Sequence, residues 1–387
     1  MTKRYINNKT SECSKPLRVL YIINSFSWGG AEKLVYDLSI GLIKKAEFVG
    51  VIALYRQDND TETKMIADLK KVGVKTAILG KTAGKGRIKS IYDIYQFGKI
   101  NRVNIIHGHC SVPMLFAKIA GKMLRVPVVC TIHNTRGYSA KREKNSSWMV
   151  SKYVSIGQAV ENYMIQELNI KKNNIVPIFN SINTEQFPIV KKDPNFWVKY
   201  GGKKGEQVIL NVARVHQQKN QLCLARAINR CIKDGESNIR AYILGNFDES
   251  DQTYIELRKY IENEGIADHI IFLGMHQNVN DFLHNADCFV MTSKYEGLSV
   301  AFLEAVISGL AIVVTDMPFV RELNSISNCS TVIQQDDDKA LASILEKKSY
   351  KQQSLETISL FKEKFSMKEF VDQHYNLYKK VLDSTVS

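Results

Sequence analysis

Two carboxylates lie eight residues apart within one short stretch of the sequence, Cys288 to Asp316. Glu296 stands in a polar loop after an apolar run, and Glu304 lies among apolar residues of a helix-like segment. A carboxylate in apolar surroundings needs hydroxyl or cationic partners, because burying it alone is costly. The spacing equally fits a solvated loop residue and a partner of the helix dipole.

Two cations have a comparable placement earlier in the chain. Arg214 directly follows an apolar run, and Lys219 begins a helical pattern five residues later. Two fixed cations beside a helix N-terminus can converge on one diphosphate. The alternative is a pair of ordinary surface cations.

Two further positions carry weaker signals. Gly29 and Gly30 separate the first apolar run from a helical pattern, where glycine lets backbone N–H groups approach an anion. His109 ends the triplet His-Gly-His at the close of another apolar run. A plain turn and a packed strand-end histidine remain alternatives.

The elements that must position these residues follow an alternating pattern of strands and helices, as in parallel sheets. Short apolar runs predict strands at residues 18–24, 49–55, 75–79, 103–107, 127–132, 152–156, 174–179, 207–213, 239–244, 269–273, 288–292 and 311–315. Helical patterns cover residues 63–72, 88–99, 159–168, 219–233, 252–264, 279–285 and 299–308, and a last one begins at about 367. With 387 residues, this pattern predicts two α/β domains.

Composition narrows the class of protein. Apolar residues make up 44% and charged residues 24%, as in soluble globular proteins, and there is no apolar run of 18 residues. The polar N-terminal arm lacks an apolar signal segment, and the seven cysteines form no C-x-x-C pair. We therefore expect a cytoplasmic protein without structural zinc. The triplet Asp58-Asn59-Asp60 is a weak candidate for metal binding.

The charge is unevenly distributed. Residues 1–185 carry a net charge of +16 and the remainder −2, which together make the +14 of the chain. This asymmetry predicts an anionic partner for the first domain only, such as nucleic acid, an anionic membrane surface or a phosphorylated substrate. The basic aromatic segment 136–148 suits lipid headgroups, but also fits a solvated loop.

Four ordered elements resemble those of one enzyme family. G-G-A-E, H-x-H, R-x4-K-N and E-x7-E, in this order, are similar to motifs of the retaining glycosyltransferases of family four, which have the GT-B fold. The sequence departs from the family at Ala213, at Ala311, at residues 317–319, and at Ser181 and Asn183 of the hinge segment.

The resemblance implies two facing Rossmann-like domains with the active site in a cleft between them. Residues 1–185 would form the acceptor-binding domain and residues 186–366 the nucleotide-sugar domain. Residues 367–387 would form a helix that crosses back to the first domain.

The resemblance also implies residue roles. Arg214, Lys219 and backbone N–H groups near Gly297 would stabilise the departing diphosphate. Glu296 would hold sugar hydroxyls and Glu304 the ribose hydroxyls, while His109 would contact the sugar from the other domain. The implied catalytic residues are His109, Glu296, Arg214 and Lys219. The implied donor-binding residues are Gly29, Gly30, Arg214, Lys219, Met275, Glu296, Gly297, Leu298, Ser299 and Glu304.

The expected function is retaining transfer from a nucleotide sugar, such as a UDP- or GDP-sugar, to a lipid-diphosphate-linked or saccharide acceptor in bacterial surface polysaccharide or lipopolysaccharide synthesis. No metal cofactor and no nucleic acid are expected. The basic domain would contact the inner face of the cytoplasmic membrane. The alternatives are a sugar-nucleotide epimerase and a non-catalytic protein that binds nucleotide sugar or nucleic acid.

Overall fold

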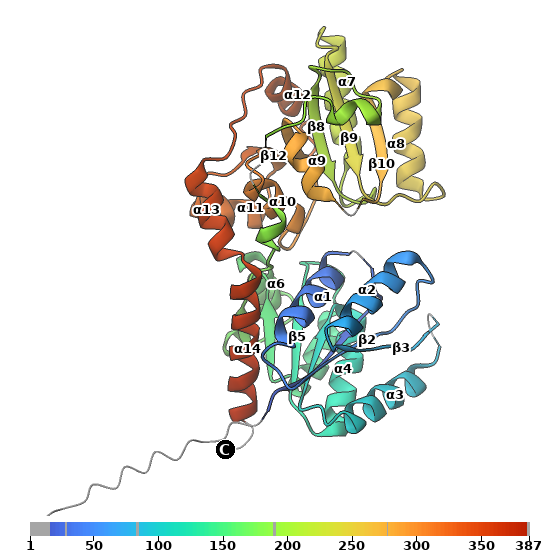
Figure 1. The fold of residues 1–387 in the computed structure, drawn as a ribbon, viewed down its shortest axis with the longest axis vertical. Coiled ribbons are helices and arrows are strands. Elements are labelled where there is room, and N and C mark those ends of the chain that lie inside the picture. Colours follow the sequence, from blue (N-terminus) through green and yellow to red (C-terminus); the bar gives the residue numbers. More distant parts are fainter. Residues whose placement is uncertain (1–15, 28, 83–84, 189–190, 277, 385–387) are drawn as a thin grey trace, which may run out of the picture.

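Two parallel β-sheets with helices packed against them are stacked along the long axis of the molecule (Figure 1). The computed structural model describes residues 16–27, 29–82, 85–188, 191–276 and 278–384. The polar arm 1–15 lies outside the described residues, and so do residues 83 and 84 of the glycine-rich basic stretch 81–89.

The first sheet has seven strands in the order β3-β2-β1-β4-β5-β6-β7. Its strands are β1 Arg18–Ile23, β2 Phe48–Ala53, β3 Lys75–Ile78, β4 Ile105–His109, β5 Val128–Ile132, β6 Lys152–Ser155 and β7 Ile175–Pro177. Its helices are α1 Gly30–Leu42, α2 Asp60–Lys71, α3 Arg87–Ile100, α4 Ser111–Leu124, α5 Ala140–Ser146 and α6 Gln158–Gln166, with the 3-10 turns η1 Ser147–Met149, η2 Lys172–Asn174 and η3 Thr184–Gln186. The central strands are buried on both faces, which explains their continuous apolar runs.

The second sheet has six strands in the order β10-β9-β8-β11-β12-β13. Its strands are β8 Gln207–Val212, β9 Ile239–Leu244, β10 Ile270–Gly274, β11 Cys288–Met291, β12 Ala311–Thr315 and β13 Thr331–Ile333. Its helices are α7 Gln221–Lys233, α8 Gln252–Asn263, α9 Val279–Asn285, α10 Val300–Ile307, α11 Pro318–Ile326, α12 Asp338–Glu346 and α13 Leu355–Lys364, with η4 Phe196–Tyr200 before β8 and η5 Ala267–His269 before β10.

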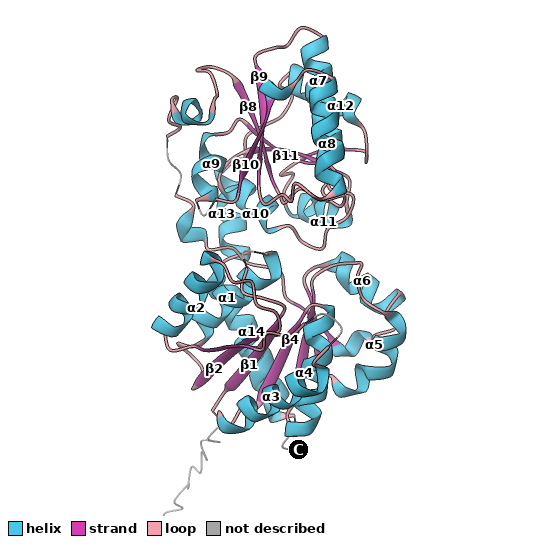
Figure 2. Ribbon diagram, turned by 90° about the vertical axis from the view of Figure 1, so that its right-hand side faces the viewer, coloured by secondary structure: helices cyan, strands magenta, loops and turns pink. Residues whose placement is uncertain are grey.

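Both sheets reverse their strand order at a central pair, β1 with β4 and β8 with β11. In open α/β sheets, ligands bind at the carboxyl ends of the strands at such a reversal point. Figure 2 shows these strand ends of the first sheet directed toward the second domain. The topology therefore creates two potential binding edges that face each other.

The last helix, α14 Met367–Asp383, returns to the first domain and packs against α1 (Figure 1). Its Leu377 and Tyr378 share a core with Tyr21 and Leu38 of that domain. No helix in the described part of the chain is long and apolar enough to cross a membrane.

The structure agrees with every strand predicted from the sequence to within two residues at each end. The sequence pattern did not indicate α4, which is buried almost all round and so lacks a polar stripe. The basic segment 136–148 contains α5 and the first two residues of η1. Asn59 of the acidic triplet caps α2, accepting the Glu62 backbone N–H.

Candidate functional site

Most of the predicted site residues come at or after the ends of the four strands at the two reversal points. Gly29 and Gly30 come after β1, His109 ends β4, Arg214 comes after β8, and Glu296 follows β11. The topology therefore brings residues that are far apart in sequence to two facing edges.

Lys219 and Glu296 form an ion pair in the second domain, and both side chains are largely buried. Backbone and side-chain hydrogen bonds hold their loops together. Gln218 donates its side-chain amide to the Tyr295 carbonyl at 2.8 Å, and the Lys294 N–H donates to the Gln218 carbonyl at 2.8 Å. A cation and a carboxylate are thus fixed side by side, as required to bind a phosphate next to hydroxyl groups.

The loop after β8 is equally well supported. Gly245 has φ of +155°, and a Cβ there would lie 2.3 Å from the Ala213 carbonyl oxygen. The Gln221 side chain donates to the Arg214 carbonyl at 3.0 Å. Only a glycine at 245 allows this approach of the two loops, and the Arg214 side chain between them is exposed.

Glu304 lies buried in α10, whose N-terminus is capped by the Ser299 hydroxyl accepting from the Phe302 N–H. Burial raises the pKa of Glu304 to about 7; Lys33 opposes this shift and Asp37 adds to it. Lys33 and Asp37 form an ion pair of 3.0 Å on α1 of the first domain. Glu304 therefore faces a charged pair from the opposite domain, which the sequence did not predict.

Glu32 is a second residue that lies between the domains. Burial raises its pKa, while hydrogen bonds from its own backbone and from Asn24, together with the charge of Arg214, oppose the shift. A Cβ at Gly29 would lie 2.6 Å from the Glu32 carboxylate, so Gly29 leaves the space that this side chain occupies. The G-G-A-E motif contains Glu32, but the sequence interpretation selected only its glycines.

His109 is held by other histidines. Its Nδ1 lies 3.0 Å from His133 Nε2, and its ring centroid lies 4.1 Å from that of His107, with the two rings tilted by 33°. Its Nε2 is buried and has no hydrogen-bond partner among the described residues. Burial lowers the pKa of His109 well below its usual value, and His107 and His133 lower it further. A neutral imidazole with one free ring nitrogen results.

His133, which the sequence interpretation did not select, joins the two domains. A Cβ at Gly297 would lie 2.3 Å from the His133 carbonyl oxygen. Arg136, three residues on, lies over the Tyr295 ring at 4.4 Å. Glycine at 297 is therefore required by this approach of the two backbones. Nearby, the Asn180 side chain donates to the Leu298 carbonyl at 3.0 Å.

Met275 is the predicted residue that the structure leaves apart. It follows β10, two strands away from β8, and its side chain is 53% exposed. Gly30 begins α1 in open space, where a Cβ would meet nothing within 4 Å.

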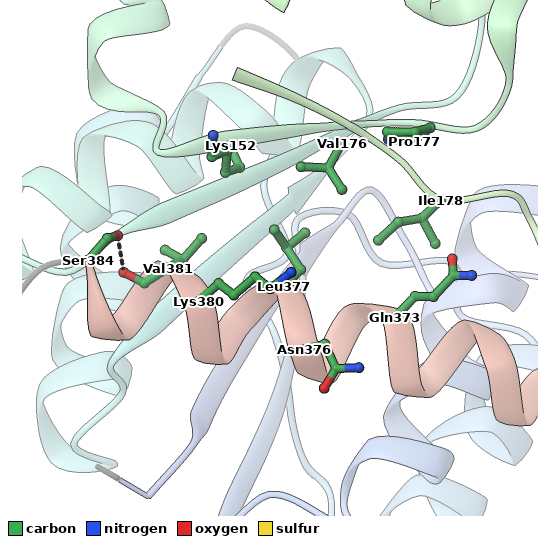
Figure 3. Close-up of a pocket in the computed structure, with 10 residues that line it drawn as sticks. All are labelled: Lys152, Val176, Pro177, Ile178, Gln373, Asn376, Leu377, Lys380, Val381 and Ser384. Carbon is green, nitrogen blue, oxygen red and sulfur yellow. Dashed lines mark hydrogen bonds between the residues drawn. The ribbon is translucent and has the colours of Figure 1, made fainter. Parts of the chain in front are cut away.

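Two grooves follow α14 rather than these strand ends. One of about 480 Å³ lies between α14 and the edge strand β7, with Leu377 and Val381 directed toward Val176 (Figure 3). The other, of about 470 Å³, shares Pro177 and Gln373 with it. None of the predicted site residues lines either groove, so the grooves are separate from the candidate site.

Chemically, the second domain presents two cations and two carboxylates, and the first presents a neutral imidazole and a third carboxylate. Such a set can hold a diphosphate and several hydroxyl groups between the domains. In the described residues, no group of three or more His, Cys, Asp or Glu side chains is arranged to hold a metal ion.

Comparisons with known proteins agree with this arrangement. The family described as Glycosyltransferase Family 4 matches residues 28–186, and that described as Glycosyl transferases group 1 matches residues 194–359. The structure of Anabaena Alr3699/HepE in complex with UDP is similar with a TM-score of 0.78 and 16% identity, covering 94% of this chain and 100% of that one. A glycosyltransferase from Rickettsia africae ESF-5 has a TM-score of 0.80 at 17% identity, covering 95% and 99%.

Two curated relatives are similar over most of the chain. The UDP-Gal:alpha-D-GlcNAc-diphosphoundecaprenol alpha-1,3-galactosyltransferase of Escherichia coli is 24% identical over 283 residues, 66% of this chain and 72% of that protein. The N-acetyl-alpha-D-glucosaminyl L-malate synthase of Bacillus anthracis is 20% identical over 295 residues, 72% of this chain and 75% of that protein.

The two facing sheets and these structural neighbours define a protein of the GT-B fold. The chain belongs to glycosyltransferase family four, whose two models together span most of it. The protein is therefore a glycosyltransferase that uses a nucleotide-sugar donor, and the epimerase and non-catalytic alternatives are not favoured.

Proposed function

We propose that the protein transfers a sugar, with retention at the anomeric carbon, from a UDP-sugar to a lipid-diphosphate-linked acceptor in surface polysaccharide synthesis. The observation that carries the proposal is the largely buried ion pair of Lys219 and Glu296. It is supported by two electrostatic interactions between the domains, that of Arg214 with Glu32 and that of Glu304 with Lys33. UDP bound in a structural neighbour and the diphosphoundecaprenol acceptor named for the E. coli relative support the two substrate classes.

In this proposal Arg214 and Lys219 bind the donor diphosphate, together with the backbone around Gly297, Leu298 and Ser299. These groups stabilise the charge that develops as the bond between the anomeric carbon and the phosphate oxygen breaks. The acceptor oxygen forms its bond on the same face, and its proton passes to the departing phosphate. Because protein cations already offset the diphosphate charge, no metal cofactor is needed.

The remaining groups position the two substrates. Glu296, fixed beside Lys219, accepts hydrogen bonds from sugar hydroxyls, and Glu304 accepts those of the ribose. His109 offers its free Nε2 to the sugar from the first domain. The backbone at Met275 contacts the base, and Gly29 and Gly30 line the path to the diphosphate.

The two domains divide this work. Residues 1–185 hold the acceptor, residues 186–366 hold the donor, and residues 367–387 tie the domains together. The strongly positive first domain supports an acceptor at the anionic inner face of the cytoplasmic membrane.

The diphosphate assignment is tested by Arg214→Ala and Lys219→Ala. Each loses a charge-assisted contact, so kcat/KM should fall about 30- to 1000-fold, which corresponds to about 2–4 kcal/mol. Arg226→Ala, an exposed arginine of α7, is the matched control and should keep full activity. Release of UDP in the presence of a lipid-diphosphate acceptor is the measurement. Unchanged turnover in both site variants would remove the assignment.

Retention is tested on the product. Proton NMR of the transferred sugar gives its anomeric coupling constant, which should match that of the donor. An inverted product would contradict the proposed same-face attack.

A further inference from the structure

Most of the positive charge of this protein is concentrated in a short part of the first domain. Residues 81–152 contain fourteen Lys and Arg but only two Asp and Glu, so they carry +12 of the net +14. The two acidic residues are already neutralised in the structure. Asp93 pairs with Lys89 at 2.8 Å, and Glu143 pairs with the buried Lys118 at 2.5 Å. The remaining cations make this part of the surface strongly positive.

The same part of the chain exposes large apolar side chains. On α3, Ile88 is 86% and Ile100 76% exposed, and Tyr92 between them is 53% exposed. Met123 at the end of α4 is 45% exposed and Trp148 of η1 is 67% exposed. Isolated exposed apolar residues are common, but five gathered on neighbouring elements require an explanation.

Packing places these five side chains on adjacent elements. A Cβ at Gly98 of α3 would lie 2.5 Å from a methyl group of Leu124, so the ends of α3 and α4 are in close contact. Lys122 of α4 lies over the Trp148 ring at 5.0 Å, which holds η1 beside the same end of α4. Figures 1 and 2 both show α3 next to α4. We call the residues Ile88, Tyr92, Ile100, Met123 and Trp148 the α3 face.

The helix α3 itself shows that its outward side is unusual. It packs into the domain through Ser90, Ile94 and Gly98, spaced four residues apart. Its opposite side should then be polar, as in an ordinary surface helix. Instead, isoleucine and tyrosine alternate there with Arg87, Lys89 and Lys99.

We propose that the α3 face docks on an anionic lipid bilayer. Isoleucine, methionine and tryptophan enter the boundary between headgroups and acyl chains, while Arg87, Lys99 and Lys122 bind the lipid phosphates. In the described residues none of these three cations forms an ion pair with a carboxylate. The face lies on the opposite side of the first sheet from α1 and α14.

Charge argues against two other occupants. A second copy would bring two strongly positive faces together, which repel each other. Nucleic acid would complement the positive charge, but aliphatic side chains such as Ile88 and Ile100 would add little to its binding free energy. This inference rests on the proposed function, since a lipid-linked acceptor is presented at a membrane surface.

Docking is tested by sedimenting the full chain with vesicles. The variant Ile88→Ser/Ile100→Ser/Trp148→Ser removes three exposed side chains and should fold normally, because none lies in the core. Ile255→Ser/Leu355→Ser is the matched control in the second domain, where these side chains are 45% and 73% exposed. Vesicles of phosphatidylglycerol and phosphatidylethanolamine are compared with phosphatidylcholine alone.

The wild-type protein and the control should bind the anionic vesicles, and binding should weaken with salt. The triple variant should bind at least about tenfold more weakly. Equal binding by the triple variant and the control would overturn the proposal, as would a loss confined to oligonucleotide binding or to self-association.

A water-soluble short-chain acceptor separates this inference from the enzymatic function. The triple variant should transfer sugar to it at the wild-type rate, because the α3 face contains no site residue. If wild-type protein docks through this face yet transfers to no lipid-diphosphate acceptor, the proposed acceptor fails and docking stands. If transfer proceeds and docking is unaffected by the variant, only the docking inference fails.

Discussion

Donor binding should depend on pH through Glu304. Burial raises the pKa of Glu304 to about 7, with Lys33 opposing and Asp37 adding to the shift. If the ionised carboxylate accepts the ribose hydroxyls, the donor binds only the deprotonated form. The apparent Kd is then almost constant above pH 8 and rises about tenfold from pH 8 to pH 6, since each pH unit below the pKa costs about tenfold.

Two variants in the first domain should move the midpoint of this pH dependence, which is the pKa of Glu304, in opposite directions. Asp37→Asn removes the carboxylate that raises the Glu304 pKa, so the midpoint should fall below 7. Lys33→Met removes the opposing cation, so the midpoint should rise. Glu304→Gln should bind donor more weakly and without pH dependence in this range.

Isothermal titration calorimetry with a UDP-sugar between pH 5.5 and 8.5 measures these midpoints. Both donor phosphates keep one charge throughout this range, and His133, with a pKa of about 4, stays neutral. Glu32→Gln controls for the other carboxylate between the domains and should leave the midpoint unchanged. A flat profile for the wild-type protein, or shifts of Asp37→Asn and Lys33→Met in the same direction, would refute the reasoning.

Three further predictions concern the contacts around the site. Gly297→Ala should lower the free energy of unfolding by about 1–3 kcal/mol and reduce kcat/KM, because the new Cβ would collide with the His133 carbonyl. Gly30→Ala is the control: a Cβ there meets open space, so the melting temperature should not change. Tyr378→Phe should cost about 1–3 kcal/mol in urea unfolding, because His107 Nδ1 loses its 2.6 Å partner inside the core. The free energy of unfolding should be fully retained above pH 6.5 and decline below it, because burial lowers the pKa of four histidines, His107, His109, His133 and His374. Each histidine that stays neutral in the folded protein lowers this free energy by about 1.4 kcal/mol per pH unit until its folded pKa is reached. Urea midpoints at pH 7 and pH 5 would show the decline.

Twelve strands of the two sheets could be predicted from sequence, and the central ones are recognisable because they are buried on two faces. The short edge strand β13, which is partly exposed, was not predicted. A run such as Cys288–Met291 has no solvent side, so every position is apolar and the run stands out between polar loops. Helix α4 could not be recognised in the same way, since Lys118 and Pro113 lie on its buried, otherwise largely apolar surface and disturb the helical pattern. Lys118 is compatible with that position only because it pairs with Glu143, a contact between distant segments.

The placement of site residues was predictable only in part. Arg214 and Glu296 follow strands that the pattern identifies, so their common edge could be inferred. His133 could also have been found, because β4 and β5 are parallel neighbours with His109 opposite Thr131, which places the residue two positions later beside His109. The electrostatic interaction of Glu304 with Lys33 could not have been found, since it depends on how two helices of different domains meet.

The two domains differ in net charge, and this affects how the second domain can bind a diphosphate. The second domain has a net charge of −2, so it has no general positive field to attract a diphosphate and must rely on local cations. One of these, Lys219, is already paired with Glu296, and its removal would leave that largely buried carboxylate unpaired beside the phosphates. Replacing Lys219 should therefore weaken diphosphate binding by more than the loss of one contact. Replacing the exposed Arg214 removes only its attraction for the diphosphate. The first glutamate of the E-x7-E stretch thus depends on a lysine from another loop. The spacing of the two glutamates alone does not predict this contact.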